Sequence, residues 1–145
     1  MSKRLWYLSG GMQKFGKENF NESNDWRIRV GDKIRQETYG NITVFNPNSH
    51  FSFCSDPESY TEREVMNLDI FKLRNSELIV FNDNDPFSRG SMIELGIGYE
   101  RRIPIFVLHT SIEPIHCWVR SMAEKIFTSE EELIEYLIFH YYNID

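Results

Sequence analysis

The sequence predicts a single α/β domain, residues 1–145, built on a five-stranded parallel sheet with helices on both faces. Three observations lead to this fold class. A chain of 145 residues, 41% of them hydrophobic, suits one domain with one core. Five short runs are apolar throughout, as strands covered on both faces are. Segments with helical spacing separate these runs, and this alternation predicts parallel strands joined by helices.

The five strands are expected where β-branched and aromatic residues form short continuous runs. In chain order the runs are RLWYLS (4–9), ITVFN (42–46), ELIVFN (77–82), IPIFVLH (103–109) and KIFTS (125–129). They are continuous rather than alternating, so each is expected inside the sheet with both faces buried.

The first helix is expected at residues 24–38, after a cap at Asn24 or Asp25. Its expected core contacts are Ile28, Val30 and Ile34.

Two further helices open with the spacing of a capping box, in which a Ser or Thr and a Glu three residues later cap each other's backbone N–H groups. The segment TEREVMNLDIFKLRN begins with Thr61 and Glu64, and SEEELIEYLIFHYY begins with Ser129 and Glu132. The second of these helices is expected to direct four residues inward: Leu133, Tyr136, Leu137 and Phe139.

A flavodoxin-like arrangement fits this order of elements, and in such sheets ligands bind outside the carboxyl ends of the strands. Those ends are Ser9-Gly10-Gly11, Asn46-Pro47, Asn82-Asp83 and His109-Thr110. Two long connections, residues 10–24 and 47–60, leave the same edge, where long loops are more often functional than idle.

Composition narrows the choice of partners. The net charge is −6 and the basic residues do not cluster, which argues against a nucleic-acid polymer but leaves room for a small anionic ligand. The first apolar run soon meets glycines and polar residues, so neither a signal peptide nor a membrane span is expected. Cys54 and Cys117 show no metal or redox spacing, which favours a reduced, cytoplasmic setting.

Several familiar site motifs are missing from the sequence. The four histidines, His50, His109, His116 and His140, have no metal-ligand spacing, and no metal site is expected. YLSGGM lacks the third glycine of a dinucleotide fingerprint, although two glycines at a strand end still allow a ligand to approach closely. Neither a Ser-His-Asp elbow nor a P-loop is present.

The segment SRGSMIELGIG carries one carboxylate, Glu94, with Gly90 and Gly98 one helical turn away on either side. Glycine costs a helix interior roughly 1 kcal/mol relative to alanine, so two glycines need a reason. A local explanation is that Ser91 and Glu94 have capping-box spacing. A functional explanation is that the glycines let a ligand or another backbone approach an acid near a helix N-terminus that favours anions. The spacing alone leaves both open.

Asp69 is a second unusual acid, because helical spacing places it beside Val65, Met66 and Leu73 on the apolar face. A buried acid needs a partner or a task, and spacing alone favours a cap or an arginine partner. Three loop aspartates are expected to support turns rather than catalysis: Asp56, Asp83 and Asp85.

Together, YLSGGM, NDWR, VFNPN and SELIVFNDNDPFSRGSMIELGIGYERRIPIF resemble the nucleoside 2-deoxyribosyltransferase-like superfamily. That superfamily includes base-exchanging transferases and 2'-deoxynucleoside 5'-monophosphate N-glycosidases. The resemblance runs from the first strand to WVRSMAEKIFTSEEELIEYL and rests on the order and spacing of short motifs. It implies a flavodoxin-like fold, cleavage of an N-glycosidic bond and a small-molecule nucleoside or nucleotide as substrate, with no metal or organic cofactor.

The resemblance also implies roles for individual residues. The nucleophilic glutamate of the superfamily falls on Glu94, its partner acid on Asp69, and the tyrosine of its first strand on Tyr7. The positions implied around the substrate are Ser9, Gly10, Gly11, Trp26, Asn46, Asn82, Ser88, Gly90, Ser121 and Met122.

Two of these positions are serines that concern whether the substrate carries a 5'-phosphate. Ser88 stands where the transferases tend to carry aspartate and the nucleotide hydrolases a serine that contacts the 5'-phosphate. RSMA, residues 120–123, resembles a hydrolase segment whose serine reaches phosphate from a neighbouring subunit, and this role would fall on Ser121. The departures from the transferase pattern favour nucleotide hydrolysis, and a homodimer or larger homo-oligomer is expected.

The chemistry follows from the residue types. Cleaving a C1'–N bond builds oxocarbenium character, which a carboxylate beneath C1' stabilises before it forms a glycosyl ester. Attack on that ester by water makes a hydrolase, and attack by a second base makes a transferase. The alternative is a non-catalytic nucleotide-binding or sensing module, against which the joint presence of Tyr7, Asp69 and Glu94 argues. A receiver-like signalling domain would need clustered aspartates where this chain has Ser9-Gly10-Gly11.

Overall fold

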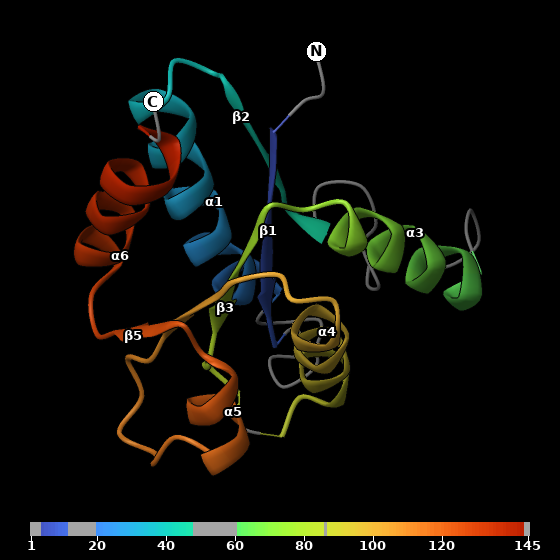
Figure 1. The fold of residues 1–145 in the computed structure, drawn as a ribbon. Coiled ribbons are helices and arrows are strands. Elements are labelled where there is room, and N and C mark those ends of the chain that lie inside the picture. Colours follow the sequence, from blue (N-terminus) through green and yellow to red (C-terminus); the bar gives the residue numbers. More distant parts are fainter. Residues whose placement is uncertain (1–3, 12–19, 48–60, 86, 144–145) are drawn as a thin grey trace.

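The computed structural model describes residues 4–11, 20–47, 61–85 and 87–143, and its centre is a five-stranded parallel sheet (Figure 1). The strands are β1 (Arg4–Gly10), β2 (Ile42–Phe45), β3 (Leu78–Asn82), β4 (Ile105–Leu108) and β5 (Lys125–Phe127). Their spatial order is β2-β1-β3-β4-β5, and every neighbouring pair is parallel. This is the flavodoxin-like order, so the predicted fold class is confirmed.

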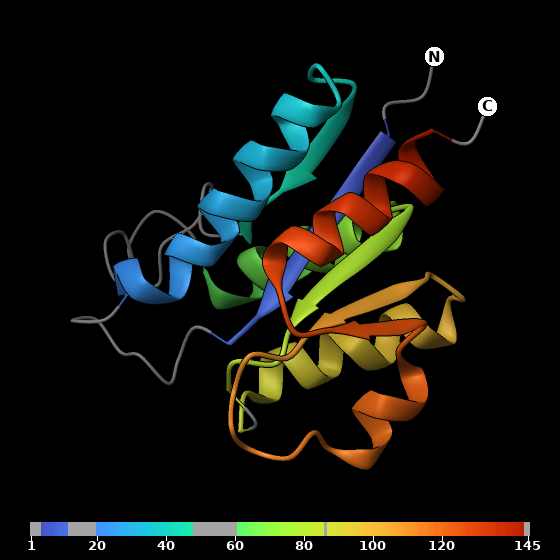
Figure 2. The ribbon, with the colours of Figure 1, turned by 90° about the vertical axis from the view of Figure 1, so that its left-hand side faces the viewer.

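Helices cover both faces of the sheet. The helices α1 (Phe20–Glu37) and α6 (Glu130–Leu137) lie on one face, and α3 (Glu62–Arg74), α4 (Arg89–Glu100) and α5 (Cys117–Met122) lie on the other. Figure 2 shows α1 and α6 in front of the strands, with α3 and α4 behind them. The strands β3 and β4 are buried along their whole length, which explains their continuous apolar sequences. At the edge of the sheet β5 exposes Lys125 and Ile126, so the expectation that this run is buried on both faces is wrong.

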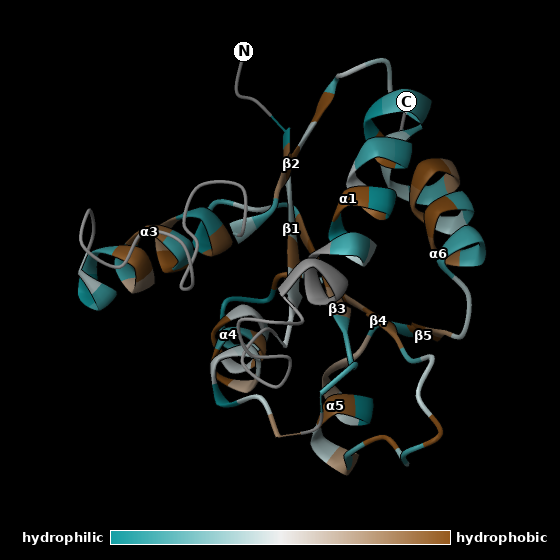
Figure 3. Cartoon of the chain, turned by 180° about the vertical axis from the view of Figure 1, so that it is seen from behind, coloured by the Kyte–Doolittle hydropathy of each residue, from teal (hydrophilic) through white to brown (hydrophobic). Residues whose placement is uncertain are grey.

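Alternate residues of β1 pack into two separate hydrophobic cores. Trp6 and Leu8 pack with α1 and α6, whereas Tyr7 packs with the layer that contains α3 and α4. The helices carry both hydrophilic and hydrophobic residues, as Figure 3 shows for α1, α3 and α6. The odd-numbered positions of β1 therefore point toward α4, and this decides what Tyr7 and Ser9 can contact.

The helix α1 begins four residues before its predicted cap, so a cap at Asn24 or Asp25 is wrong. Trp26, Val30 and Ile34 are buried at a spacing of four residues. Ile28 lies two residues from Trp26, which places it on the far side of the helix, and it is 46% exposed. Its predicted core contact is therefore wrong.

The capping box of α3 is confirmed, since Thr61 and Glu64 cap each other's backbone N–H groups. At α6, the side chain of Ser129 accepts a hydrogen bond from the Glu132 N–H.

Beyond Leu137 the α-helix gives way to a π-helical turn, Ile138–Tyr142. Its wider winding shifts the register, so Ile138, Tyr141 and Tyr142 pack against the core while Phe139 is 71% exposed. The predicted inward position of Phe139 is therefore wrong.

No helix in the described part of the chain is long and apolar enough to cross a bilayer. The two connections expected to be functional, together with His50, Cys54 and Asp56, lie in or extend into segments outside the described residues.

Gly98 sets how closely α4 packs on the sheet. A Cβ at this position would lie 2.3 Å from Cδ1 of Ile79 on β3, whereas a Cβ at Gly96 would meet nothing within 4 Å. Gly98, one turn after Glu94, thus leaves room for the side chain of Ile79, which belongs to the protein's own core.

The two glycines provide a matched stability test. We expect Gly96→Ala to raise the free energy of unfolding by about 0.5–1 kcal/mol through helix propensity alone. At Gly98 the same gain is opposed by overpacking of about 1–3 kcal/mol, so Gly98→Ala should be less stable than Gly96→Ala. Urea unfolding of both variants measures the difference, and equal stabilisation by the two alanines would contradict the packing argument.

Candidate active site

The helix α4 starts at a serine cap rather than at a capping box. The side chain of Ser88 accepts a hydrogen bond from the Ser91 N–H, 3.4 Å away, and the two serine hydroxyls are 2.9 Å apart. Glu94 lies beyond the first turn of the helix that begins at Arg89, too far along to cap the backbone. The local explanation of Glu94 as a reciprocal cap of Ser91 is therefore wrong.

The carboxylate of Glu94 is bound to the central strand of the sheet. The Tyr7 hydroxyl donates a hydrogen bond to Oε2, and Ser9 Oγ donates one to Oε1 at 2.9 Å. Tyr7 and Ser9 are alternate residues of β1, so both point to the face that α4 covers. Each carboxylate oxygen thus has a fixed donor.

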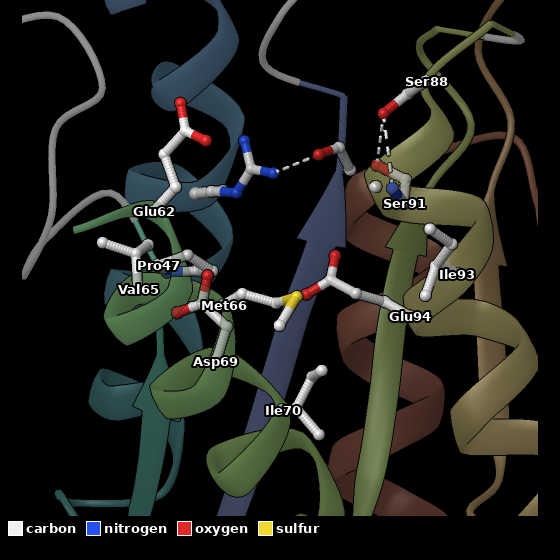
Figure 4. A pocket seen from close by; sticks show the side chains of 13 residues that line it. Pro47, Glu62, Val65, Met66, Asp69, Ile70, Ser88, Ser91, Ile93 and Glu94 are labelled. Atoms are coloured by element: carbon white, nitrogen blue, oxygen red, sulfur yellow. Dashed lines mark hydrogen bonds between the residues drawn. The ribbon is translucent and has the colours of Figure 1, made fainter.

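A pocket opens beside this carboxylate, between the N-terminal parts of α3 and α4. Thirteen residues line it: Gly10, Arg27, Pro47, Glu62, Val65, Met66, Asp69, Ile70, Ser88, Gly90, Ser91, Ile93 and Glu94. Figure 4 shows Asp69 on α3 and Glu94 on α4 directed into it from opposite walls. Val65, Met66 and Ile70 add an apolar surface, which suits a ligand with both a charged part and a flat or apolar part.

Arg27 is a part of this site that sequence reasoning missed. The residue is 1% exposed, and its Nη2 donates a hydrogen bond of 2.6 Å to the carbonyl of Gly10 at the end of β1. The available signal was the NDWR motif, which puts a cation directly beside the buried Trp26. A charge at such a position is usually solvated, so the motif alone did not indicate burial.

The two acids of the pocket differ in their surroundings. Burial raises the pKa of Glu94, while the Tyr7 and Ser9 hydrogen bonds and the charge of Arg27 oppose this rise. Burial and the nearby charge of Glu94 raise the pKa of Asp69 to about 7. Asp69 Oδ1 is buried and has no hydrogen-bond partner among the residues described. When the pair holds one proton, Asp69 is therefore the better place for it.

Tyr7 remains a hydrogen-bond donor throughout the useful pH range. Burial and the charges of Glu94 and Asp69 raise the pKa of its phenol far above the ordinary value. A protonated phenol can donate to Glu94 without adding negative charge to the pocket.

Several other predicted site residues lie at the same edge of the sheet. Ser88 and Gly90 line the pocket, and a Cβ at Gly90 would meet nothing within 4 Å. Asn46 follows β2 and Asn82 ends β3, and both are buried. The described lining of the pocket includes neither asparagine.

The predicted Gly10 lines the pocket and also makes contacts within the protein, as do Gly11 and Trp26. Trp26 belongs to the core beneath α1, and its ring would be 3.0 Å from a Cβ at Gly10. At Gly11 a Cβ would lie 2.5 Å from the Cβ of Asp85, and the Gly11 N–H donates to Asn84 Oδ1 at 3.0 Å. Gly11 thus lets the end of β1 approach the loop that precedes α4, and Gly10 leaves room for the Trp26 ring.

Ser121 and Met122 lie on α5, away from the residues that line the Glu94 pocket of the same chain. The Ser121 hydroxyl is exposed and donates to the Cys117 carbonyl at 2.9 Å. His116 caps α5 by accepting from the Trp118 N–H, and the Trp118 side chain is 70% exposed. The Ser121 and Trp118 side chains therefore face solvent in the single chain, whereas Met122 packs against the core.

Two loop aspartates have structural partners. Asp83 Oδ2 is 3.0 Å from His109 Nδ1, and Asp85 Oδ1 accepts a hydrogen bond from the Phe87 N–H. Within the described ranges, no group of three or more His, Cys, Asp or Glu side chains is arranged to hold a metal ion.

Comparison with known proteins identifies solved structures that have the same fold. No protein-family model matches the chain, and no curated protein matches it either. A solved structure of a conserved protein from Enterococcus faecalis is similar with a TM-score of 0.75 and 16% identity, over 92% of this chain and 96% of that chain. A 2-deoxyribosyltransferase from Bacillus psychrosaccharolyticus is similar with a TM-score of 0.70 and 17% identity, over 91% of each chain.

A CMP N-glycosidase from Clostridium botulinum is similar with a TM-score of 0.61 and 17% identity, over 94% of this chain and 99% of that chain. At such identities the likeness shows a shared fold. The fold that the sequence motifs implied is thereby confirmed.

The raised pKa of Asp69 makes stability depend on pH. The folded state holds this proton up to about pH 7, whereas the ordinary value is 3.8, so the free energy of unfolding falls as pH rises between these values. Asp69→Asn removes the ionisation and should exceed the wild type at pH 8 by about 1–2 kcal/mol, with partial exposure of the side chain reducing the full effect. Urea unfolding from pH 4 to pH 8 measures this.

Asp25→Asn, at an exposed position of α1, is the control and should keep the pH dependence of the wild type. Parallel curves for the wild type and Asp69→Asn would show that Asp69 titrates normally.

Proposed function

We propose that the protein cleaves the N-glycosidic bond of a 2'-deoxynucleoside 5'-monophosphate or a 2'-deoxynucleoside, with Glu94 as the nucleophile. The observation that carries this proposal is the pair of acids in one pocket, with Glu94 held by Tyr7 and Ser9 and facing Asp69. The sequence motifs point to the same chemistry. Two proteins of the same fold are named as a 2-deoxyribosyltransferase and a CMP N-glycosidase, which supports the choice of substrate class.

In the first step an oxygen of Glu94 attacks C1' as the C1'–N bond breaks. The bonding electron pair leaves with the base, and the proton of Asp69 goes to the base directly or through a water that Asp69 holds. The product on the protein is a glycosyl ester of Glu94. Tyr7 and Ser9 hold the carboxylate in place, so the attacking group does not have to be oriented during the reaction.

In the second step a water, or a second base, attacks C1' of the ester. The C1'–O bond breaks and its electrons return to the Glu94 carboxylate, while the proton of the nucleophile goes to Asp69. The two acids are thus restored to their starting state. A proton-sharing pair suits this exchange, because Asp69 titrates near neutral pH and can both give and take the proton.

Hydrolysis of a nucleotide is favoured over base transfer by the serines at the start of α4. Ser88 and Ser91 line the pocket, six and three residues before Glu94, at a helix N-terminus whose backbone N–H groups attract anions. A 5'-phosphate placed there would leave the sugar near Glu94. The superfamily's serine at this position has that role in the nucleotide hydrolases that the sequence resembles.

A homo-oligomer belongs to this proposal through Ser121. Its hydroxyl lies outside its own chain's pocket and is exposed on α5, so it can contribute only to the pocket of another subunit. We therefore assign to Ser121 a phosphate contact across a subunit interface.

The activity is tested with a panel of deoxynucleosides and their 5'-monophosphates, each with and without a second free base. Free base in the absence of an acceptor means hydrolysis, exchanged base means transfer, and no turnover of any substrate would favour a binding or sensing module. Glu94→Gln should lower turnover by about 10⁴-fold or more, because it removes the attacking carboxylate. Glu100→Gln, an exposed acid on the same helix that does not line the pocket, is the matched control and should keep wild-type turnover.

A Glu94→Gln protein that unfolds like the wild type and keeps full turnover would exclude Glu94 as nucleophile. Chromatography of the products measures the turnover, and urea unfolding of the same variant distinguishes loss of chemistry from loss of folding.

The role of Ser121 is tested by mixing two impaired variants, Glu94→Gln and Ser121→Ala. In a mixed dimer one site would hold both changes and the other neither, so randomised subunits should recover about a quarter of wild-type activity toward a nucleotide. No recovery, an unimpaired Ser121→Ala protein, or an active monomer would each contradict a contribution across subunits.

A further inference from the structure

Arg27 places a full positive charge in the interior of the protein. Its side chain is 1% exposed, and its guanidinium lies 4.9 Å from the centre of the Trp26 ring. Burial lowers the pKa of Arg27 to about 10, so the side chain is still charged at neutral pH. A buried charge is expensive unless other groups compensate it, and the nature of those groups indicates its use.

The position of Arg27 relative to the two layers of helices is informative. Arg27 is on α1, which covers the opposite face of the sheet from α3 and α4, yet it lines the same pocket as Asp69 and Glu94. Its hydrogen bond to the Gly10 carbonyl fixes where it reaches across, namely at the carboxyl end of β1. A Cβ at Gly10 would lie 3.4 Å from Nη2 of Arg27 and 3.0 Å from the Trp26 ring, so the glycine makes room for both side chains.

We propose that Arg27 is a positioning residue of the active site, which holds the end of β1 through the Gly10 carbonyl and supplies the positive charge that balances the carboxylates of Glu94 and Asp69. This inference rests on the proposed function for its catalytic meaning, although the charge balance itself is a property of the free protein. Arg27 acts through Glu94 and β1, and no contact with the reacting atoms is assigned to it.

The titratable groups around Glu94 come from three elements. Tyr7 and Arg27 approach it from β1 and α1, and α3 contributes Asp69 together with Glu62 at the exposed rim. Tyr7 is neutral and a hydrogen-bond donor, so its contribution does not cancel a full negative charge. Among these described groups Arg27 brings the cation, and both acids are stabilised in their ionised forms by it.

A guanidinium suits this task better than an ammonium. It keeps its charge when buried, and its several N–H groups allow one to bond to the Gly10 carbonyl while the charge is spread over the whole group. Without it, Glu94 would hold its proton to higher pH and would be a poorer nucleophile at neutral pH. The acidic limb of the pH profile of activity would then shift to higher pH.

The primary test measures the ionisation of Glu94 in the free protein, without any substrate. Carboxyl ¹³C shifts are followed by NMR from pH 3 to pH 9, with the Glu94 signal assigned through Glu94→Gln. Arg27→Met should raise the Glu94 midpoint by about one pH unit or more, because an opposite charge is lost from its surroundings. Arg27→Lys should restore part of the wild-type midpoint, and the exposed Arg29→Met, on the same helix, should leave it unchanged.

The second measurement is the pH profile of kcat/KM for these variants, whose acid limb should move with the Glu94 midpoint. If the wild type turns over none of the substrates, the proposed function fails, but the NMR titration still decides the charge balance. If Arg27→Met leaves both the midpoint and the acid limb in place, the inference about Arg27 is overturned.

A double variant keeps the test decisive if Arg27→Met alone does not fold. Arg27→Met/Glu94→Gln removes both charges, so it should fold and should unfold at a higher urea concentration than Arg27→Met. If Arg27→Met costs the same stability in the wild-type and Glu94→Gln backgrounds, Arg27 contributes packing alone and the proposal is wrong.

Discussion

The site depends on the attachment of Glu94 to the central strand through the hydroxyls of Tyr7 and Ser9. The connection after β1 leads to β2 on one side, and the connection after β3 leads to β4 on the other, so a crevice forms between the carboxyl ends of β1 and β3. The attachment brings an acid of α4 into that crevice. It also fixes the start of α4, where Ser88 and Ser91 lie, relative to the sheet.

The fold was predictable because each of its causes is local or periodic. Apolar runs mark the strands, caps such as Thr61 mark helix starts, and the alternation of elements restricts the sheet to a few topologies. The errors have local physical causes too. Ile28 lies off the buried stripe of a helix that starts earlier than its cap signal, and Phe139 lies in a π-helical turn that periodicity of 3.6 residues does not describe.

The candidate site was only partly predictable. Glu94 and Asp69 stood out as acids in apolar segments, and their shared pocket gives both a common explanation. Arg27 could not be placed in the same way, because periodicity assigns a charged residue to a solvated face and does not show that its helix, from the other layer, reaches the pocket. The Ser91–Glu94 spacing was misleading for a related reason, since the cap at Ser88 had already satisfied the Ser91 N–H.

The spread of the site along the chain couples its assembly to folding. Tyr7 and Glu94 are separated by 87 positions, whereas Arg27 is only 17 positions from the carbonyl that it binds. Contacts between distant segments close large loops and tend to form late. The hydrogen bond of Arg27 to the Gly10 carbonyl can therefore form well before the hydrogen bond of Tyr7 to Glu94. During synthesis Glu94 is the last of the four groups Tyr7, Arg27, Asp69 and Glu94 to emerge. Glu94 therefore meets Tyr7 and Ser9 only when α4 has docked on the sheet, and an incompletely folded chain would hold Arg27 at the end of β1 without the acid that we propose as nucleophile.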